Sequence, residues 1–178
     1  MRKLILYSAV SLDNYIARPN GKVDWLEDPD YVKPKEDYGY HKFYETIDTT
    51  LMGNGTYKIL EDFDVPFPYP DKTNYVFSRS KENEDTEFIK YIYGDIIGFT
   101  QQLKETAGKD IWLIGGGQIN SELLNHDLID RIILTTFPIV LGKGIPLFNG
   151  EVKESKFELV ESQHFDYGLL QLTFDKKQ

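Results

Sequence analysis

The sequence "DIWLIGGGQINSELL" occupies residues 110–124 and joins an apolar run to a helical pattern through three consecutive glycines. The apolar run shows no alternation with polar residues, which is typical of a strand buried on both faces of a parallel sheet. A junction of the same kind, "LMGNGTYKIL", occupies residues 51–60, and further apolar runs lie at residues 3–10, 74–78 and 131–137. Strands that alternate with helices predict an α/β fold with a largely parallel sheet covered on both faces.

Helical patterns lie between these strands. The clearest, residues 94–107, places apolar side chains on one stripe, with Asp95 near its start and Gly108 after its end. At the end of the chain, residues 157–166 and 169–174 alternate between apolar and polar, which predicts an antiparallel hairpin at the sheet edge. The sheet is therefore expected to be mixed. Shorter helices are expected at residues 40–47, 56–63 and 118–126.

The composition narrows the classes of function. A chain of 178 residues without an internal repeat or linker suits one domain, residues 1–178. The chain has no cysteine, which excludes disulfides, thiolate metal sites and cysteine nucleophiles. A formal charge of -9 disfavours nucleic-acid binding, because such proteins present a basic face to phosphate. No apolar run approaches the roughly 18 residues of a membrane span, so we expect a soluble, cytoplasmic protein that does not bind membranes.

The two glycine junctions each predict a site for an anion. A helix N-terminus offers unpaired N–H donors and a partial positive charge, and glycine lets an anion approach closely. In the first junction Gly53 and Gly55 precede Thr56, which is expected to cap the helix. Glycines between a strand and a helix also occur simply as tight turns. Asn120 stands where a Rossmann fingerprint needs its third glycine, and no Walker motif is present, so neither of those folds is expected.

Five segments carry a resemblance to a known family. "SLDNYIA", "MGNGTYKIL", "FSRS", "LIGGGQI" and "VLGKGIPLF" occur in the order and at roughly the spacing of the dihydrofolate reductase superfamily. They look closest to the branch related to the reductase domain of bacterial riboflavin biosynthesis proteins, and the resemblance spans about residues 2–175. It implies a three-layer α/β/α fold with a mixed sheet, NADPH as the cofactor and a homodimer.

The same resemblance implies the residues that contact the dinucleotide. The nicotinamide would lie near Ala9 and Ile16. The ribose and 2′-phosphate of the adenosine would lie at Ser78, Arg79 and Ser80. The phosphates would lie between the two glycine turns, at Gly53, Asn54, Gly55 and Thr56 on one side and at Gly115, Gly116, Gly117, Gln118 and Ile119 on the other.

One departure from the family pattern affects the choice between NADPH and NADH. The family commonly has arginine after Met-Gly, where this chain has Asn54, and an amide cannot neutralise a phosphate. Arg79, helped by Lys81, would then carry the preference for NADPH, since a guanidinium pairs bidentately with phosphate. The alternative for Arg79 is an ordinary solvated residue at a strand end.

Reduction of a C=N bond needs a proton donor at the nitrogen, and the resemblance implies a carboxylic acid near the helix after the first loop. Counting forward from Trp25 gives Asp30, whereas counting back from Met52 gives Asp37. We favour Asp37 as the catalytic acid, because it lies at the expected start of the helix at residues 40–47. Its alternative role is that of a helix-capping acid. The three histidines lack the spacing of metal ligands, so no metal is expected.

The leading hypothesis is an NADPH-dependent reductase of a small, planar heterocyclic substrate. The resemblance implies hydride transfer to a C=N or ribosyl C=N group, as in a dihydrofolate reductase or a 5-amino-6-(5-phosphoribosylamino)uracil reductase. A substrate phosphate would need cations at the pocket, for which Lys33, Lys35 and Lys42 are candidates. The alternative, which we favour, is that each is a solvated charge of a loop or helix face. The alternative is a dinucleotide-binding or ligand-sensing protein without catalysis on the same scaffold.

Overall fold

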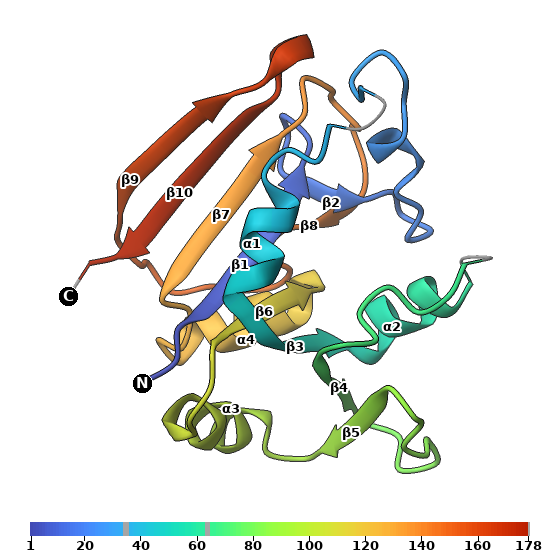
Figure 1. Ribbon diagram of the computed structural model, residues 1–178, viewed down its shortest axis with the longest axis vertical. Coiled ribbons are helices and arrows are strands. Elements are labelled where there is room, and N and C mark those ends of the chain that lie inside the picture. The colour runs from blue at the N-terminus through green and yellow to red at the C-terminus, as the bar shows by residue number, and fades with distance from the viewer. Residues whose placement is uncertain (34–35, 63–64, 178) are drawn as a thin grey trace.

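The computed structural model describes residues 1–33, 36–62 and 65–177 and centres on an eight-stranded sheet (Figure 1). The strand order is β5-β4-β3-β6-β1-β7-β10-β9. The first six of these strands run parallel to one another, and β10 runs antiparallel to both β7 and β9. The strands are β1 Leu4–Val10, β3 Ile47–Gly53, β4 Thr73–Ser78, β5 Ile89–Tyr93, β6 Asp110–Gly115, β7 Arg131–Thr136, β9 Phe157–His164 and β10 Leu170–Lys176.

Four α-helices cover the two faces of this sheet. They are α1 Tyr40–Thr46, α2 Asn54–Glu61, α3 Ile96–Glu105 and α4 Gly117–Asn125. Leu103 of α3 and Leu123 of α4 belong to one apolar cluster with alternate residues of the central strands. Phe43 of α1 and Tyr57 of α2 belong to a second cluster with the intervening residues. Two clusters on opposite faces of buried strands give three layers, and the expected α/β/α fold with a mixed sheet and a C-terminal hairpin is confirmed.

Several details differ from the sequence-based expectations. The edge strand β5 was not expected, nor was the small antiparallel pair of β2, Tyr15–Ala17, with β8, Ile145–Pro146. Helix α2 begins at Asn54 with Gly53 at its N-cap, so Thr56 lies inside the helix and the expectation that it caps the helix is wrong. The expected end of this helix, residue 63, lies outside the described residues.

The long segment between β2 and α1 packs onto the molecule through aromatic side chains. It contains a short 3-10 helix, Asp24–Leu26, whose Trp25 is 1% exposed and lies edge-on to Phe137 at 5.2 Å between ring centroids. Trp25 belongs to a third apolar cluster with Phe137 and Leu169. The described part of this segment is therefore anchored over the end of β7. No helix in the three described stretches of chain is long and apolar enough to span a membrane.

Candidate functional site

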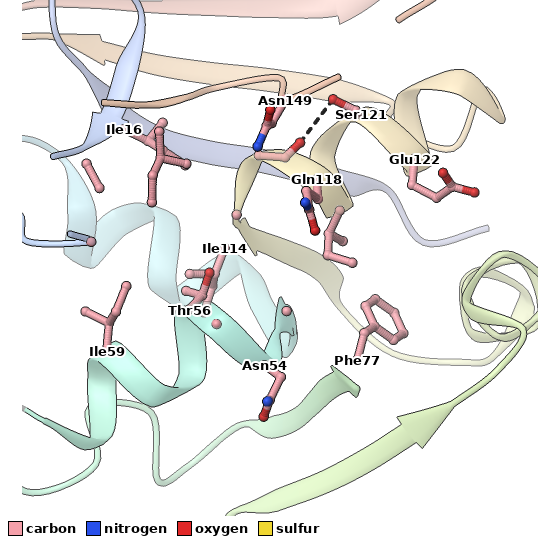
Figure 2. Close-up of a pocket in the computed structure, with 18 of the residues that line it drawn as sticks. Ile16, Asn54, Thr56, Ile59, Phe77, Ile114, Gln118, Ser121, Glu122 and Asn149 are labelled. Carbon is pink, nitrogen blue, oxygen red and sulfur yellow. Dashed lines mark hydrogen bonds between the residues drawn. The ribbon is translucent and has the colours of Figure 1, made fainter. Parts of the chain in front are cut away.

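A cavity of about 1660 Å³ runs across the carboxyl ends of five neighbouring parallel strands, β5, β4, β3, β6 and β1. Ligands of open α/β sheets bind at this edge. The volume exceeds the roughly 300 to 1,000 Å³ of a site for one drug-sized ligand. Figure 2 shows Ile16 and Ile59 at one side of the cavity, Phe77 and Glu122 at the other, and Thr56 and Gln118 between them. The cavity therefore has room for an extended ligand or for two ligands together.

The two glycine turns face each other across the middle of this cavity. They follow the adjacent strands β3 and β6, in which Met52 pairs with Gly115. A Cβ atom on Gly53 would lie 3.1 Å from Cγ1 of Ile119, and one on Gly116 would lie 3.2 Å from Oγ1 of Thr56. No side-chain oxygen of the described residues caps α2 or α4. Two helix N-termini thus open into one cavity with backbone donors available for an anion.

The glycines of the two turns differ in whether the surrounding protein would tolerate a side chain. Gly115 has φ +111°, a conformation that side chains rarely adopt, and the peptide bond to Gly116 is cis. A Cβ atom on Gly117 would overlap the carbonyl oxygen of Pro146. A Cβ atom on Gly55, in contrast, would meet no protein atom within 4 Å. The fold itself therefore requires Gly115 and Gly117, whereas nothing nearby in the protein requires Gly55.

Among the described residues that line the cavity, one buried side-chain acceptor has no hydrogen-bond partner. Ser121 donates to the carbonyl oxygen of Gly117 at 3.0 Å, the bond dashed in Figure 2. Asn54 lines the cavity, and its Oδ1 is buried without a hydrogen-bond partner among the described residues. A buried, unpaired acceptor costs about 1 to 3 kcal/mol. A ligand that donates a hydrogen bond at this point would remove that cost.

One end of the cavity carries positive charge. Ser78 ends β4, and it lines this end together with the next three residues, Arg79, Ser80 and Lys81. The exposed guanidinium of Arg79 lies 3.4 Å from Oε1 of Gln118 on α4, so it reaches across the rim between the two elements. The Oγ atom of Ser78 accepts a hydrogen bond from Nδ2 of Asn83 at 2.8 Å, which fixes the turn. This end can pair with an anionic group.

The opposite end is mostly apolar. Ala9 of β1 and Ile16 of β2 line it, together with Ile59 and Leu60 of α2. The sequence analysis did not name three further lining residues, Tyr7, Trp112 and Ile114. Tyr7 lies two residues before Ala9 in β1 and could have been found by strand alternation, because residues i and i+2 point to the same face. This end suits a planar, largely apolar ring.

Both candidate acids lie outside the described lining of the cavity. The Asp37 carboxylate accepts hydrogen bonds from the backbone N–H groups of Gly39 at 3.0 Å and His41 at 3.1 Å. These bonds hold the pKa of the Asp37 carboxyl below its usual range. Asp37 therefore behaves as a capping acid before α1, and its catalytic role stays a prediction. Asp30 is exposed, and its N–H donates to the carboxylate of Asp28.

The lysines considered for a substrate phosphate do not line the cavity where the structure describes them. Lys33 pairs with Asp166 and lies 5.5 Å above the ring of Tyr167. Lys42 is exposed on α1, and Lys35 lies outside the described residues. No group of three or more potential metal ligands occurs in the described part of the chain.

Comparisons with known proteins agree with this geometry. The family model of the RibD C-terminal domain matches residues 2–171. The uncharacterized protein YwjB of Bacillus subtilis is 40% identical over 164 residues, which cover 92% of each chain. A putative riboflavin biosynthesis protein from Shewanella sp. PV-4 is 31% identical, with a TM-score of 0.88 and coverage of 99% of both chains.

A more distant structure shares the fold alone. Dihydrofolate reductase from Enterococcus faecalis, solved in complex with NADP(H), is 16% identical. Its TM-score is 0.71, over 99% of this chain and 97% of that one. The chain therefore has a dihydrofolate-reductase-like fold and belongs to the RibD C-terminal domain family.

Proposed function

We propose that the protein is an NADPH-dependent reductase that transfers a hydride to a C=N or ribosyl C=N group of a planar heterocycle. The observation that carries this proposal is the single cavity that joins two uncapped helix N-termini, a cationic end and an apolar end. A phosphorylated dinucleotide has the matching order of groups, with a central pyrophosphate, a 2′-phosphate near one end and a nicotinamide ring at the other.

The residues present fit this cofactor. The backbone N–H groups at Gly53–Thr56 and at residues 116–119 would hold the pyrophosphate. Arg79 and Lys81 would hold the 2′-phosphate. The unpaired Oδ1 of Asn54 is an acceptor, so it fits a ribose hydroxyl rather than a phosphate. When bound, the cofactor would supply the hydride. The protein would bind and orient the cofactor and the substrate, and it would exclude water from the site.

The comparisons with known proteins support the proposal of a reductase at the level of the family. The chain belongs to a family of reductase domains, and the Shewanella relative is described as a putative riboflavin biosynthesis protein. The Enterococcus enzyme of the same fold is complexed with NADP(H). We include in the proposal the homodimer that the resemblance implies and the cytoplasmic location expected from the sequence.

The test is NADPH oxidation by the purified protein, followed by the loss of NADPH absorbance. The two substrates are dihydrofolate and 5-amino-6-(5-phosphoribosylamino)uracil, each compared with a reaction that lacks substrate. We expect substrate-dependent oxidation with one of the two. NADPH binding without oxidation of either would contradict the proposal as stated.

One observation favours a second candidate, a dinucleotide-binding sensor without catalysis. The described residues at the apolar end of the cavity include no carboxylate, and Asp37 is held ionised outside it. A sensor needs no proton donor. Tight NADPH binding that changes the affinity for a heterocycle, with no turnover, would support the sensor over the reductase.

A further inference from the structure

The apolar end of the cavity lacks a carboxylic acid but contains a phenol. Among the described lining residues contributed by β1, β2, residues 19–26, α2 and β6, Tyr7 is the one with an ionisable side chain. Ser8 also lines the cavity, and its hydroxyl donates to the carbonyl oxygen of Ala9. If a substrate binds at this end, Tyr7 is the protein group there that can give up a proton.

The ring of Tyr7 is held on several sides. It stacks on Phe43 of α1, with ring centroids 4.2 Å apart and an interplanar angle of 8°. Trp112 of β6 meets it edge-on at 6.0 Å, and its indole Nε1 donates to the carbonyl oxygen of Tyr7 at 3.1 Å. Contacts from two neighbouring elements leave the ring little freedom, so the direction of the hydroxyl is fixed by the fold.

The hydroxyl of Tyr7 belongs to a polar group within this aromatic cluster. Gln171 on β10 lies beside it, because hydrogen bonding by this side chain lowers the pKa of the Tyr7 phenol. The Nε2 atom of Gln171 also donates to Oγ1 of Thr135 on β7 at 2.9 Å and to the carbonyl oxygen of Tyr38 at 3.2 Å. Two strands and the segment before α1 therefore meet at the side chain of Gln171, which these two bonds hold in place.

The titratable groups that face Tyr7 are Asp37, before α1, and Tyr40, on α1. Burial raises the pKa of the Tyr7 phenol above its usual value, the hydrogen bond with Gln171 opposes this rise, and the charge of Asp37 adds to it. Burial also raises the pKa of Tyr40 to about 12. Tyr7 therefore keeps its proton throughout the neutral range, whereas Asp37 has already lost its own.

We propose that Tyr7 is the catalytic proton donor of the reduction, positioned by Gln171. This inference rests on the proposed function. A bound nicotinamide dinucleotide would supply the hydride to the substrate carbon, and the electron pair of the C=N bond would move to the nitrogen. The nitrogen takes the proton from the Tyr7 hydroxyl, which leaves a phenolate. Water then returns a proton to the phenolate, so that the net reaction consumes one hydride and one proton.

The test compares Tyr7→Phe with a matched control, Tyr40→Phe. Both changes remove one hydroxyl and keep the ring, but Tyr40 does not line the cavity. In single-turnover reactions with the substrate that the wild type accepts, Tyr7→Phe should slow reduction by about 10²- to 10⁴-fold, the usual contribution of general acid catalysis. Tyr40→Phe should stay within about threefold of the wild type. The NADPH-induced rise in melting temperature should be the same in all three proteins.

The pH profile separates a proton donor from a packing residue. The wild-type rate of reduction should be flat between about pH 6 and 9, because the phenol stays protonated there. The rate of Tyr7→Phe should fall about tenfold per pH unit, since the proton must then come from solvent acid. A wild-type rate that falls between about pH 4 and 7 would point to a carboxylic acid and overturn the proposal, even if Tyr7→Phe did not fold.

The remaining outcomes distinguish the two proposals. Turnover by the wild type together with an undiminished rate in Tyr7→Phe overturns the role of Tyr7 and leaves the reductase intact. Absence of wild-type turnover with both substrates, despite NADPH binding, overturns the reductase and the role of Tyr7 together.

Discussion

Arg79 brings positive charge to the cavity of a chain whose formal net charge is -9. The overall field of such a protein repels anions, so an anionic ligand depends on local donors. Lys81 lies beside Arg79 in the lining, whereas Glu122 and Glu151 line the cavity along and after α4. If the ligand is NADPH as proposed, recognition of its 2′-phosphate would therefore rest on Arg79 and Lys81. Asn54 cannot replace the arginine that is common at this point in the family.

Replacing Arg79 with alanine should weaken NADPH binding by about tenfold or more and change NADH binding by less than about threefold. The reason is that a hydrogen bond to a charged group contributes about 1.5 to 3 kcal/mol, and about 1.4 kcal/mol equals a factor of ten. Titration calorimetry with both nucleotides measures the difference. Lys58→Ala is the matched control, because Lys58 is an exposed cation of α2 outside the described lining. Equal losses for NADPH and NADH would contradict the assignment.

At the scale of elements, the two strand-turn-helix junctions could be predicted because their signals are local. An apolar run, a glycine and the start of a helical pattern lie within a dozen residues at each junction. The same holds for α3, because Asp95, which was expected near its start, is the N-cap and accepts a hydrogen bond from the backbone of Gly98 at 2.8 Å. Local spacing also predicted that Asp37 precedes a helix, where its carboxylate binds the backbone of Gly39 and His41.

Features that depend on residues far apart in the sequence could not be predicted from local patterns. The strand order that makes β3 and β6 neighbours depends on the whole sheet, although the resemblance implied that the two turns share a ligand. Strand β5, "IKYIY", was missed because short aromatic runs have weak periodicity. Among the expected cofactor residues, Gly115 does not belong to the described lining, since the space where its side chain would lie is next to Asn120. Glycine at this position is explained by the positive φ of the turn.

A pair of glycine variants should separate ligand binding from folding. Gly55→Val should abolish the binding of NADPH without lowering stability, because its Cβ would meet no protein atom within 4 Å and valine is a better helix residue than glycine. Gly117→Ala should instead destabilise the protein, since its Cβ would overlap the Pro146 carbonyl oxygen. Urea unfolding and fluorescence titration with NADPH measure the two effects. A Gly55→Val protein that binds NADPH normally would remove this turn from the site.

At the scale of the whole molecule, a ligand that spans five strand ends should stabilise the entire fold. Binding to the native state alone adds about 2.7 kcal/mol at a ligand concentration one hundred times the dissociation constant. For a chain of this size, about 1 kcal/mol shifts the melting temperature by about 2 to 4 °C. We therefore expect NADPH to raise the melting temperature by roughly 5 to 10 °C. Differential scanning fluorimetry measures the shift, and no shift at saturating NADPH would exclude both the reductase and the sensor.

The pairing of β3 with β6 has a kinetic consequence. Met52 and Gly115 are neighbours in the sheet but are far apart along the chain, and such non-local parallel pairs form slowly because a long loop must close first. The two glycine turns cannot meet before this step. We therefore expect a dinucleotide not to bind the nascent or refolding chain and to leave the folding rate unchanged. It should bind only the completed fold and slow its unfolding.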